Sequence, residues 1–285
     1  RELTQLQSVL QSQIEKNSSH MFKEGAVVIP GAINFNSNYY SLKLATTFAS
    51  ETINPAQYFN STTPVTITGA TSGVTAVVVG FDVATSTDQP TLYLRYLKSG
   101  TDNLTNAFVD GENISSDAGV THTTSYSANV ASATTFTSQF SASAGSSAAN
   151  LAGSSGPASR IGSAVHIQAG IYFIRGFFVT CSEETLVLDK YTNSPSYRVG
   201  FTVTESLVTP ESDSSLLDNA TGSSNFAAKG AHRLKIALAL SKLARSSTAD
   251  STFIDLMDVK EGVVQHYARN TEYAVLEETF ARRTF

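Results

Sequence analysis

Histidines are the first residues to consider, because imidazole groups bind transition metals and transfer protons near neutral pH. The five histidines lie far apart along the chain and form no local signature such as H-E-x-x-H. Glycine motifs that cradle phosphates are absent, and so is the G-x-S-x-G turn of serine hydrolases. We therefore predict no metal and no cofactor. The histidines are His20, His122, His166, His232 and His266.

Carboxylates are the second candidate, because a pair of acids carries out glycoside hydrolysis. Glu183 and Glu184 precede a predicted strand, and Glu211, Asp213 and Asp218 share a polar loop. No spacing rule selects a catalytic pair among these acids. We interpret them as solvated loop residues. Turn capping or Ca²⁺ binding by the two aspartates remains an alternative, although the sequence lacks the EF-hand pattern.

The composition argues against several classes of function. Charged residues make up 15% of the 285 residues and the net charge is −5, whereas a nucleic-acid surface needs clustered Lys and Arg. The single cysteine, Cys181, excludes an intramolecular disulfide, and we predict a small core residue there. No apolar run reaches the roughly 20 residues that cross a membrane. We expect no nucleic-acid partner and no membrane insertion.

Residues 1–24 contain a clear helix, predicted over 1–16, for packing or oligomerisation. Its apolar residues recur at three- and four-residue spacing and therefore share one stripe. About 24 Å of isolated helix is marginally stable in water, so the stripe needs a partner, either the rest of the chain or other copies of it. A strict heptad would place Gln13 and Asn17 in the seam, which argues against a long coiled coil. The predicted interface residues of this helix are Leu3, Leu6, Leu10 and Ile14.

The rest of the chain predicts a mainly β fold. We expect several small β-sandwich or β-barrel modules, with the N-terminal helix and a short C-terminal helix. Residues 25–49 predict strands that join the domain formed by 161–285, with 36–38 as a hairpin tip. Residues 50–115 predict a small inserted β module, because short strands alternate there with turn residues.

Residues 161–285 predict a β domain with a closing helix. We expect a hairpin with a bulge or bend at Gly176. Residues 233–241 alternate as a strand does, although a helix is an alternative because Leu, Ala and Lys favour helices. We predict that residues 253–259 form a strand paired with 233–241.

Residues 116–160 form a Ser/Thr/Ala-rich linker or arm. Small side chains bury too little apolar surface to offset the entropy lost on ordering, which favours a flexible linker. The aromatic residues of this stretch favour instead an arm that orders against a neighbouring subunit. Its anchors would be Tyr126, Phe136 and Phe140.

Several passages resemble a known protein family. They run over 197–211 and 225–234, which begin Tyr-Arg-Val-Gly-Phe and Asn-Phe-Ala-Ala, and over 271–284, which begins Thr-Glu-Tyr-Ala. These passages are similar to tail and baseplate structural proteins of tailed bacteriophages, notably cyanophages. Within 50–115, the motifs Ile67–Gly73 and Gly111-Glu112 resemble a small β module of phage tail proteins.

The resemblance implies a virion component with no catalytic residues. Such a protein would be made in the host cytoplasm, reside in the phage tail, and act in baseplate or tail-fibre assembly and attachment. We expect other tail or baseplate subunits as partners, a homo-oligomer that is a trimer by analogy with tail fibres, and a chain that continues beyond residue 285. Two alternatives remain open. One is a receptor-binding module whose tyrosines contact host glycans, and the other is a glycan-degrading tail enzyme.

Overall fold

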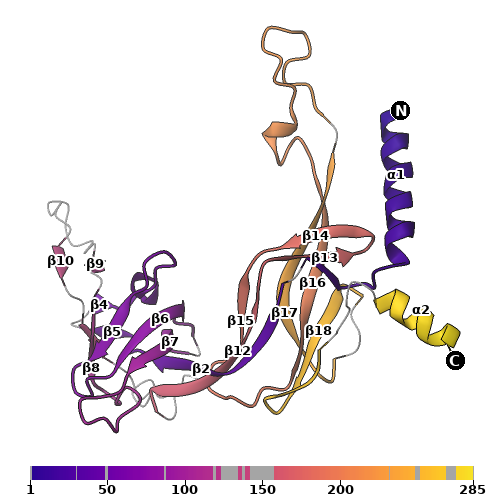
Figure 1. Cartoon of the computed structure of the whole chain (residues 1–285). Coiled ribbons are helices and arrows are strands. Elements are labelled where there is room, and N and C mark those ends of the chain that lie inside the picture. Colours follow the sequence, from indigo (N-terminus) through magenta and orange to yellow (C-terminus); the bar gives the residue numbers. More distant parts are fainter. Residues whose placement is uncertain are drawn as a thin grey trace. The chain divides into compact units, whose positions relative to one another are not determined.

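The computed structural model divides the chain into two compact units, which we describe separately (Figure 1). Unit 1 comprises Arg1–Phe35, Val165–Leu186 and Ser196–Phe285, and unit 2 comprises Asn36–Ala164 and Val187–Pro195. The structure describes residues 2–29, 31–48, 51–86, 88–117, 120–122, 134–136, 139–141, 157–230, 232–247, 251–267 and 274–284.

The predicted fold class is confirmed: strands make up 47% of the chain and helices 14%, with a helix at the N-terminus and a short one at the C-terminus. In the described part of the chain no sheet closes into a barrel. No helix of that part is long and apolar enough to cross a membrane. The helices are α1 (Glu2–Ser19) and α2 (Ala274–Thr284), with short 3-10 helices η1 (Pro55–Tyr58) and η2 (Ser214–Leu216). The strands are β1 (Ala26–Ile29), β2 (Ile33–Lys43), β3 (Thr47–Phe48), β4 (Glu51–Thr52), β5 (Thr66–Gly69), β6 (Thr75–Asp82), β7 (Thr91–Lys98), β8 (Asn113–Ser116), β9 (Val120–His122), β10 (Thr134–Phe136), β11 (Gln139–Ser141), β12 (Ser159–Ile167), β13 (Gly170–Ile174), β14 (Phe177–Cys181), β15 (Glu184–Asp189), β16 (Tyr197–Val208), β17 (Arg233–Ala244), β18 (Phe253–Lys260) and β19 (Val263–Tyr267).

The two units divide the chain differently from the expected domains. β1 pairs with β13, but the second half of β2 pairs with β7 of the predicted inserted module. β2 is also continuous through residues 36–38, so the prediction of a hairpin tip there is wrong. The reason is that Asn36 and Asn38 lie on the exposed side of an alternating strand, where polar residues need no turn.

Unit 1 is a β-sandwich of two antiparallel sheets. Their strand orders are β1-β13-β14 and β17-β16-β18-β19. The alternating apolar residues of β16 face inward, with Val199 and Phe201 fully buried. The ring of Tyr172, from β13, packs edge-on against Phe201 with centroids 4.8 Å apart. Aromatic contact between the two sheets therefore contributes to the core of this unit.

Strands β13 and β14 are joined by a two-residue turn at Arg175-Gly176. Both residues have positive φ, 50° and 82°, which is the backbone of a type I′ turn and suits the twist of a hairpin. This turn replaces the bulge or bend that was expected at Gly176 within one strand. The glycine is the second residue of the turn, because it adopts positive φ at little steric cost.

β18 pairs with β16 and not with β17, which corrects the expected pairing of 253–259 with 233–241. β17 is a strand, as its alternation predicts. All 12 residues of β17 pair with β16. The free edge of β16 then accepts β18. A Cβ on Gly200 of β16 would lie 1.9 Å from the Ile254 carbonyl oxygen, so only glycine fits this close approach.

The far ends of β16 and β17 extend as a two-stranded arm whose tip is residues 209–232 (Figure 1). This tip is the predicted polar loop. Backbone hydrogen bonds order it, including one from the Gly230 N–H to the Leu216 carbonyl at 2.9 Å. The tip is therefore a folded loop at the end of the arm.

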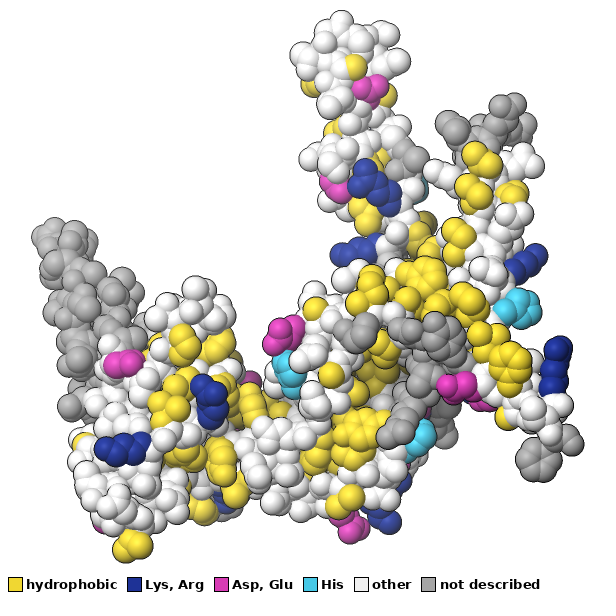
Figure 2. Space-filling model, in the orientation of Figure 1, with side chains coloured by type: hydrophobic (Ala, Val, Ile, Leu, Met, Phe, Trp, Pro, Cys, Tyr) yellow, Lys and Arg dark blue, Asp and Glu magenta, His cyan; other side chains and the backbone are white. Residues whose placement is uncertain are grey.

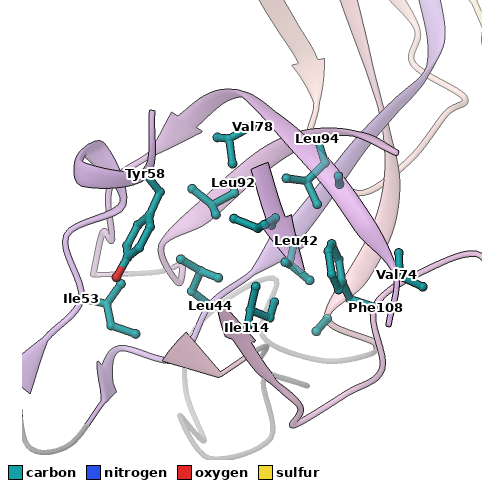
Figure 3. Packing of buried hydrophobic residues seen from close by; sticks show 13 residues of the cluster. Leu42, Leu44, Ile53, Tyr58, Val74, Val78, Leu92, Leu94, Phe108 and Ile114 are labelled. Atoms are coloured by element: carbon teal, nitrogen blue, oxygen red, sulfur yellow. The ribbon is translucent and has the colours of Figure 1, made fainter. Parts of the chain in front are cut away.

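Unit 2 is centred on an eight-stranded sheet with the order β11-β8-β5-β6-β7-β2-β12-β15. The boundary between the units falls within β2, β12 and β15. Leu42 and Leu44 share a buried face. Figure 3 shows them with Leu92, Leu94 and Ile114, from β7 and β8, in one apolar cluster.

A buried carboxylate joins the Ile67–Gly73 motif to the loop before β8. Glu112, from the second motif of the resembled module, is 4% exposed. Its carboxylate accepts hydrogen bonds from the Ser72 N–H (2.9 Å), the Ser72 hydroxyl (3.0 Å), the Thr71 N–H (3.1 Å) and the Val109 N–H (2.7 Å). Four donors satisfy a buried charge that would otherwise destabilise the fold. The two motifs are thus joined by the hydrogen bonds of the Glu112 carboxylate.

Replacing Glu112 with glutamine is expected to lower the free energy of unfolding by about 2–3 kcal/mol, because an amide NH₂ would face backbone N–H donors. Urea unfolding followed by circular dichroism measures the loss. The matched control is Glu211→Gln, whose carboxylate is exposed and pairs with Lys229 at 2.7 Å. The control should change stability by less than about 0.5 kcal/mol, and equal losses in the two variants would contradict the role of Glu112.

Candidate assembly surface

Helix α1 carries an apolar stripe that unit 1 leaves exposed. Leu6 is 55% exposed, Leu10 is 48% and Ile14 is 46%, and the neighbouring Val9 is 48%. A spacing of four residues places the first three on one side of the helix. Leu3 also lies in α1, but its side chain is outside the described residues. Figure 1 shows α1 standing clear of the strands along most of its length.

The side of α1 that contacts unit 1 is polar. The Gln11 amide donates a hydrogen bond to the Gly176 carbonyl at 3.1 Å. Glu15 lies against the same glycine, where an added Cβ would be 2.6 Å from its Cγ. Ser18 is buried. These three residues form a second stripe, roughly 100° around the helix from the apolar one, so the helix docks through polar groups and leaves its apolar side free.

The segment after α1 fixes the helix to the β13–β14 hairpin. The Phe22 ring lies 5.7 Å from both Phe173 and Phe178, between centroids. The Glu24 carboxylate accepts the Arg175 N–H at 3.0 Å, and burial raises the pKa of this carboxyl. The hairpin therefore determines the direction in which α1 leaves the sandwich.

An apolar hollow of about 360 Å³ lies between β14 and β17. Phe178 and Leu234 line it and are 45% and 50% exposed, and Ile236 lies beside them. Figure 2 shows hydrophobic side chains gathered over this part of unit 1, between α1 and the base of the arm. The alternation of residues 233–241 places Leu234 and Ile236 on one strand face, whereas no sequence pattern singles out Phe178. In the pair Phe177-Phe178, the sequence does not indicate which ring faces outward.

Helix α2 adds a further exposed apolar residue to unit 1. Phe280 is 64% exposed. The Lys23 ammonium pairs with the Glu278 carboxylate, which links α2 to the segment that follows α1. Apolar surface is therefore exposed on both terminal helices.

The predicted arm falls largely outside the described residues, and Tyr126 lies outside them. Phe136 belongs to β10 and pairs with Val120 of β9. Phe140 belongs to β11 and pairs with Ile114 of β8. Both aromatic anchors thus lie in strands, although their side chains are not described. A contact between this segment and a neighbouring subunit stays a prediction.

The acids considered as a catalytic pair have structural partners. Glu183 lies 3.5 Å from an imidazole nitrogen, Glu184 accepts a β17 backbone N–H at 3.2 Å, and Glu211 pairs with a lysine of the arm tip at 2.7 Å. Asp213 and Asp218 each accept the backbone N–H two residues ahead, at 2.9 and 2.8 Å. These two contacts confirm the turn-capping interpretation.

A small pocket of about 210 Å³ beside β16 and β18 contains Asp255 and Asp258. Arg198 binds Asp255 with two guanidinium nitrogens, one at 2.8 Å. Arg245 binds Asp258 at 2.7 and 2.8 Å, and its hydrogen bonds lower the pKa of that carboxyl. Because an arginine holds each carboxylate bidentately, we interpret the pocket as an ion-pair network that joins β16, β17 and β18.

Cys181 and His166 are two further titratable residues that the sequence singled out. Across the described residues, no three His, Cys, Asp or Glu side chains meet as a metal-binding group. Cys181 is buried, as predicted, and burial raises the pKa of its thiol. His166 lies at the sheet surface, with its Nδ1 3.0 Å from the Thr185 hydroxyl.

Replacing Asp258 with asparagine is expected to lower the melting temperature at pH 7, and the difference from wild type should shrink in acid. The folded pKa of Asp258 lies below the unfolded value of about 3.9. The contribution of this group to stability is therefore present above the unfolded pKa and is lost as the pH falls through the folded pKa. Thermal unfolding measured from neutral to acid pH tests this. The control is Glu183→Gln, and a pH-independent difference for the Asp258 variant would refute the assignment.

A protein-family model described as a domain of unknown function, DUF4815, matches residues 131–285, just over half of the chain. The match includes β16, β17, the arm tip between them and α2. No curated protein and no solved structure matches the chain significantly. Because the model covers more than half of it, the chain belongs to the family of the domain of unknown function DUF4815.

Proposed function

We propose that this chain is a structural subunit of a bacteriophage tail that acts in baseplate or tail-fibre assembly and carries out no catalysis. Its partners would be further copies of itself and other tail subunits of the virion. Two observations support the proposal. One is the resemblance of residues 197–211, 225–234 and 271–284 to tail and baseplate proteins, and the other is the exposed stripe of α1.

The orientation of α1 is the observation that carries the proposal. With 18 residues the helix is about 27 Å long, and an isolated helix of this size is marginal in water. Most amphipathic helices are stabilised by burying their apolar face. α1 instead contacts the sandwich through polar residues, of which Ser18 is buried, and exposes Leu6, Leu10 and Ile14. Covering these half-exposed side chains would contribute roughly 1 kcal/mol each.

A parallel trimer of α1 helices is the arrangement that we propose. The four predicted interface residues, Leu3, Leu6, Leu10 and Ile14, are spaced by three, four and four positions. This is the phase of an 11-residue repeat, in which helices pack with a slight right-handed supercoil. Unlike a strict heptad, this phase keeps Gln13 out of the seam.

Attachment to the host surface is a second candidate function, favoured by a groove on unit 2 that Tyr40, Tyr96 and Tyr191 line. The glycan-degrading alternative has less support. The small pocket with two carboxylates, Asp255 and Asp258, holds each of them in an arginine pair.

Sedimentation velocity of the full chain is expected to show a species with three times the mass of one chain. The triple variant Leu6→Gln, Leu10→Gln and Ile14→Gln should sediment as a monomer at micromolar concentration. Glutamine is a good helix former, so this change removes the apolar stripe while retaining helix propensity. Circular dichroism should show an unchanged β signal.

The control is the double variant Gln5→Ala and Lys16→Ala, which alters the side of α1 away from both stripes and should remain trimeric. A further check introduces one cysteine by Leu10→Cys. Because Cys181 is buried, crosslinking would report contacts between helices alone. A wild-type chain that sediments as a monomer, with no crosslinking, would contradict assembly through α1.

A further inference from the structure

Unit 2 carries an open groove of about 660 Å³ that is lined by tyrosines and neutral polar groups. Tyr40, Tyr96 and Tyr191 supply the aromatic surface. Asn106 and Asn193 are exposed and supply amide donors and acceptors. Ligand sites in proteins commonly combine apolar walls with a few polar groups in this way.

The tyrosine rings are held in fixed positions by their neighbours. Tyr40 packs edge-on against Tyr96, with ring centroids 5.0 Å apart. The ring centroid of Tyr96 also lies 5.7 Å from that of Phe108, which is buried in the core. The Tyr191 hydroxyl donates to the Asp88 carboxylate at 2.7 Å. Rings that are fixed before a ligand arrives lose little entropy on binding.

Positive charge gathers around the Tyr191 ring. The Lys43 ammonium lies 4.2 Å from the ring centroid and the Arg160 guanidinium 5.4 Å from it. Lys190 pairs with Asp88 at 3.1 Å and also with Asp82 at 2.8 Å. Three cationic side chains thus lie near the Tyr191 ring or pair with the carboxylate that it binds. Arg160 is the charged residue that lines the groove itself.

Lys43 is unusual for a residue that only stabilises the fold. It is fully buried, and its Nζ has no hydrogen-bond partner among the described residues. An ammonium without such a partner lowers the stability of an interior. Burial lowers the pKa of this group, while the Asp88 carboxylate opposes that shift. Its ammonium lies against the ring of Tyr191, which lines the groove.

We infer that this groove binds an oligosaccharide that carries carboxylate groups, with sugar rings against the tyrosines and a carboxylate at Arg160. Tyrosine faces and amide groups suit flat, hydroxyl-rich sugar rings, and a guanidinium suits a carboxylate. The described residues that line the groove include no carboxylate, so we expect binding without cleavage. The inference does not rest on the assembly role of α1.

Isothermal titration calorimetry of the full chain with a hexamer of uronic acids, compared with a neutral hexaose of the same length, tests the inference. The uronate should bind at millimolar concentration or below, and the neutral sugar about tenfold more weakly. Arg160→Gln should remove that tenfold preference. The matched control is Arg95→Gln, an exposed arginine on the opposite face of β7 from Tyr96, which should bind as wild type.

Lys43→Met separates a ligand-directed role from a structural one. It should raise the melting temperature and weaken uronate binding, whereas a structural lysine would lower the melting temperature and leave binding unchanged. The inference is overturned if neither sugar binds, if both bind equally, or if a folded Arg160→Gln variant retains full uronate affinity. It is also overturned if Arg160→Gln alters sedimentation instead of sugar binding, because the groove would then be a subunit contact. Failure of the α1 variants to dissociate would leave this result unaffected.

Discussion

Unit 1 meets helix α1 through Gln11, Glu15 and Ser18, and this polar contact leaves the apolar stripe in solvent. A single amide hydrogen bond contributes only about 1 kcal/mol of net stability, which is little for an 18-residue helix. The stability of α1 and its association with another surface are therefore coupled. In the proposed assembly, other subunits would bury the apolar stripe of α1 that remains exposed in a single folded chain.

Local patterns in the sequence predict elements well and their pairing poorly. The alternation over 233–241 correctly predicts β17. It does not specify which edge β18 joins, because an alternating strand can pair on either side. At the β13–β14 turn, Gly176 signals a positive φ, but Arg175 has φ of 50° too and its residue type does not indicate this. The sequence therefore predicts a bulge or bend there and not a two-residue turn.

The apolar stripe of α1 and the groove of unit 2 also differ in how far the sequence predicts them. The stripe of α1 follows from spacing alone, whereas its exposure depends on a hairpin far along the chain. The groove could not be predicted, because Tyr40, Tyr96 and Tyr191 lie on separate segments that only the fold of unit 2 brings together. One signal was present: Lys43 stands between Leu42 and Leu44 in a predicted strand. A lysine in such a run indicates a buried charge that needs an explanation.

The two-residue turn between β13 and β14 connects helix α1 to strand β16. Its glycine carbonyl holds α1 through Gln11, while the Arg175 guanidinium binds Glu205 of β16 at 2.6 Å and the Ser251 carbonyl at 3.2 Å. A displacement of α1 would therefore act on β16, the strand that continues into the arm. If several copies associate through their N-terminal helices, the angle of each α1 helix would therefore be linked to the direction of its β16–β17 arm.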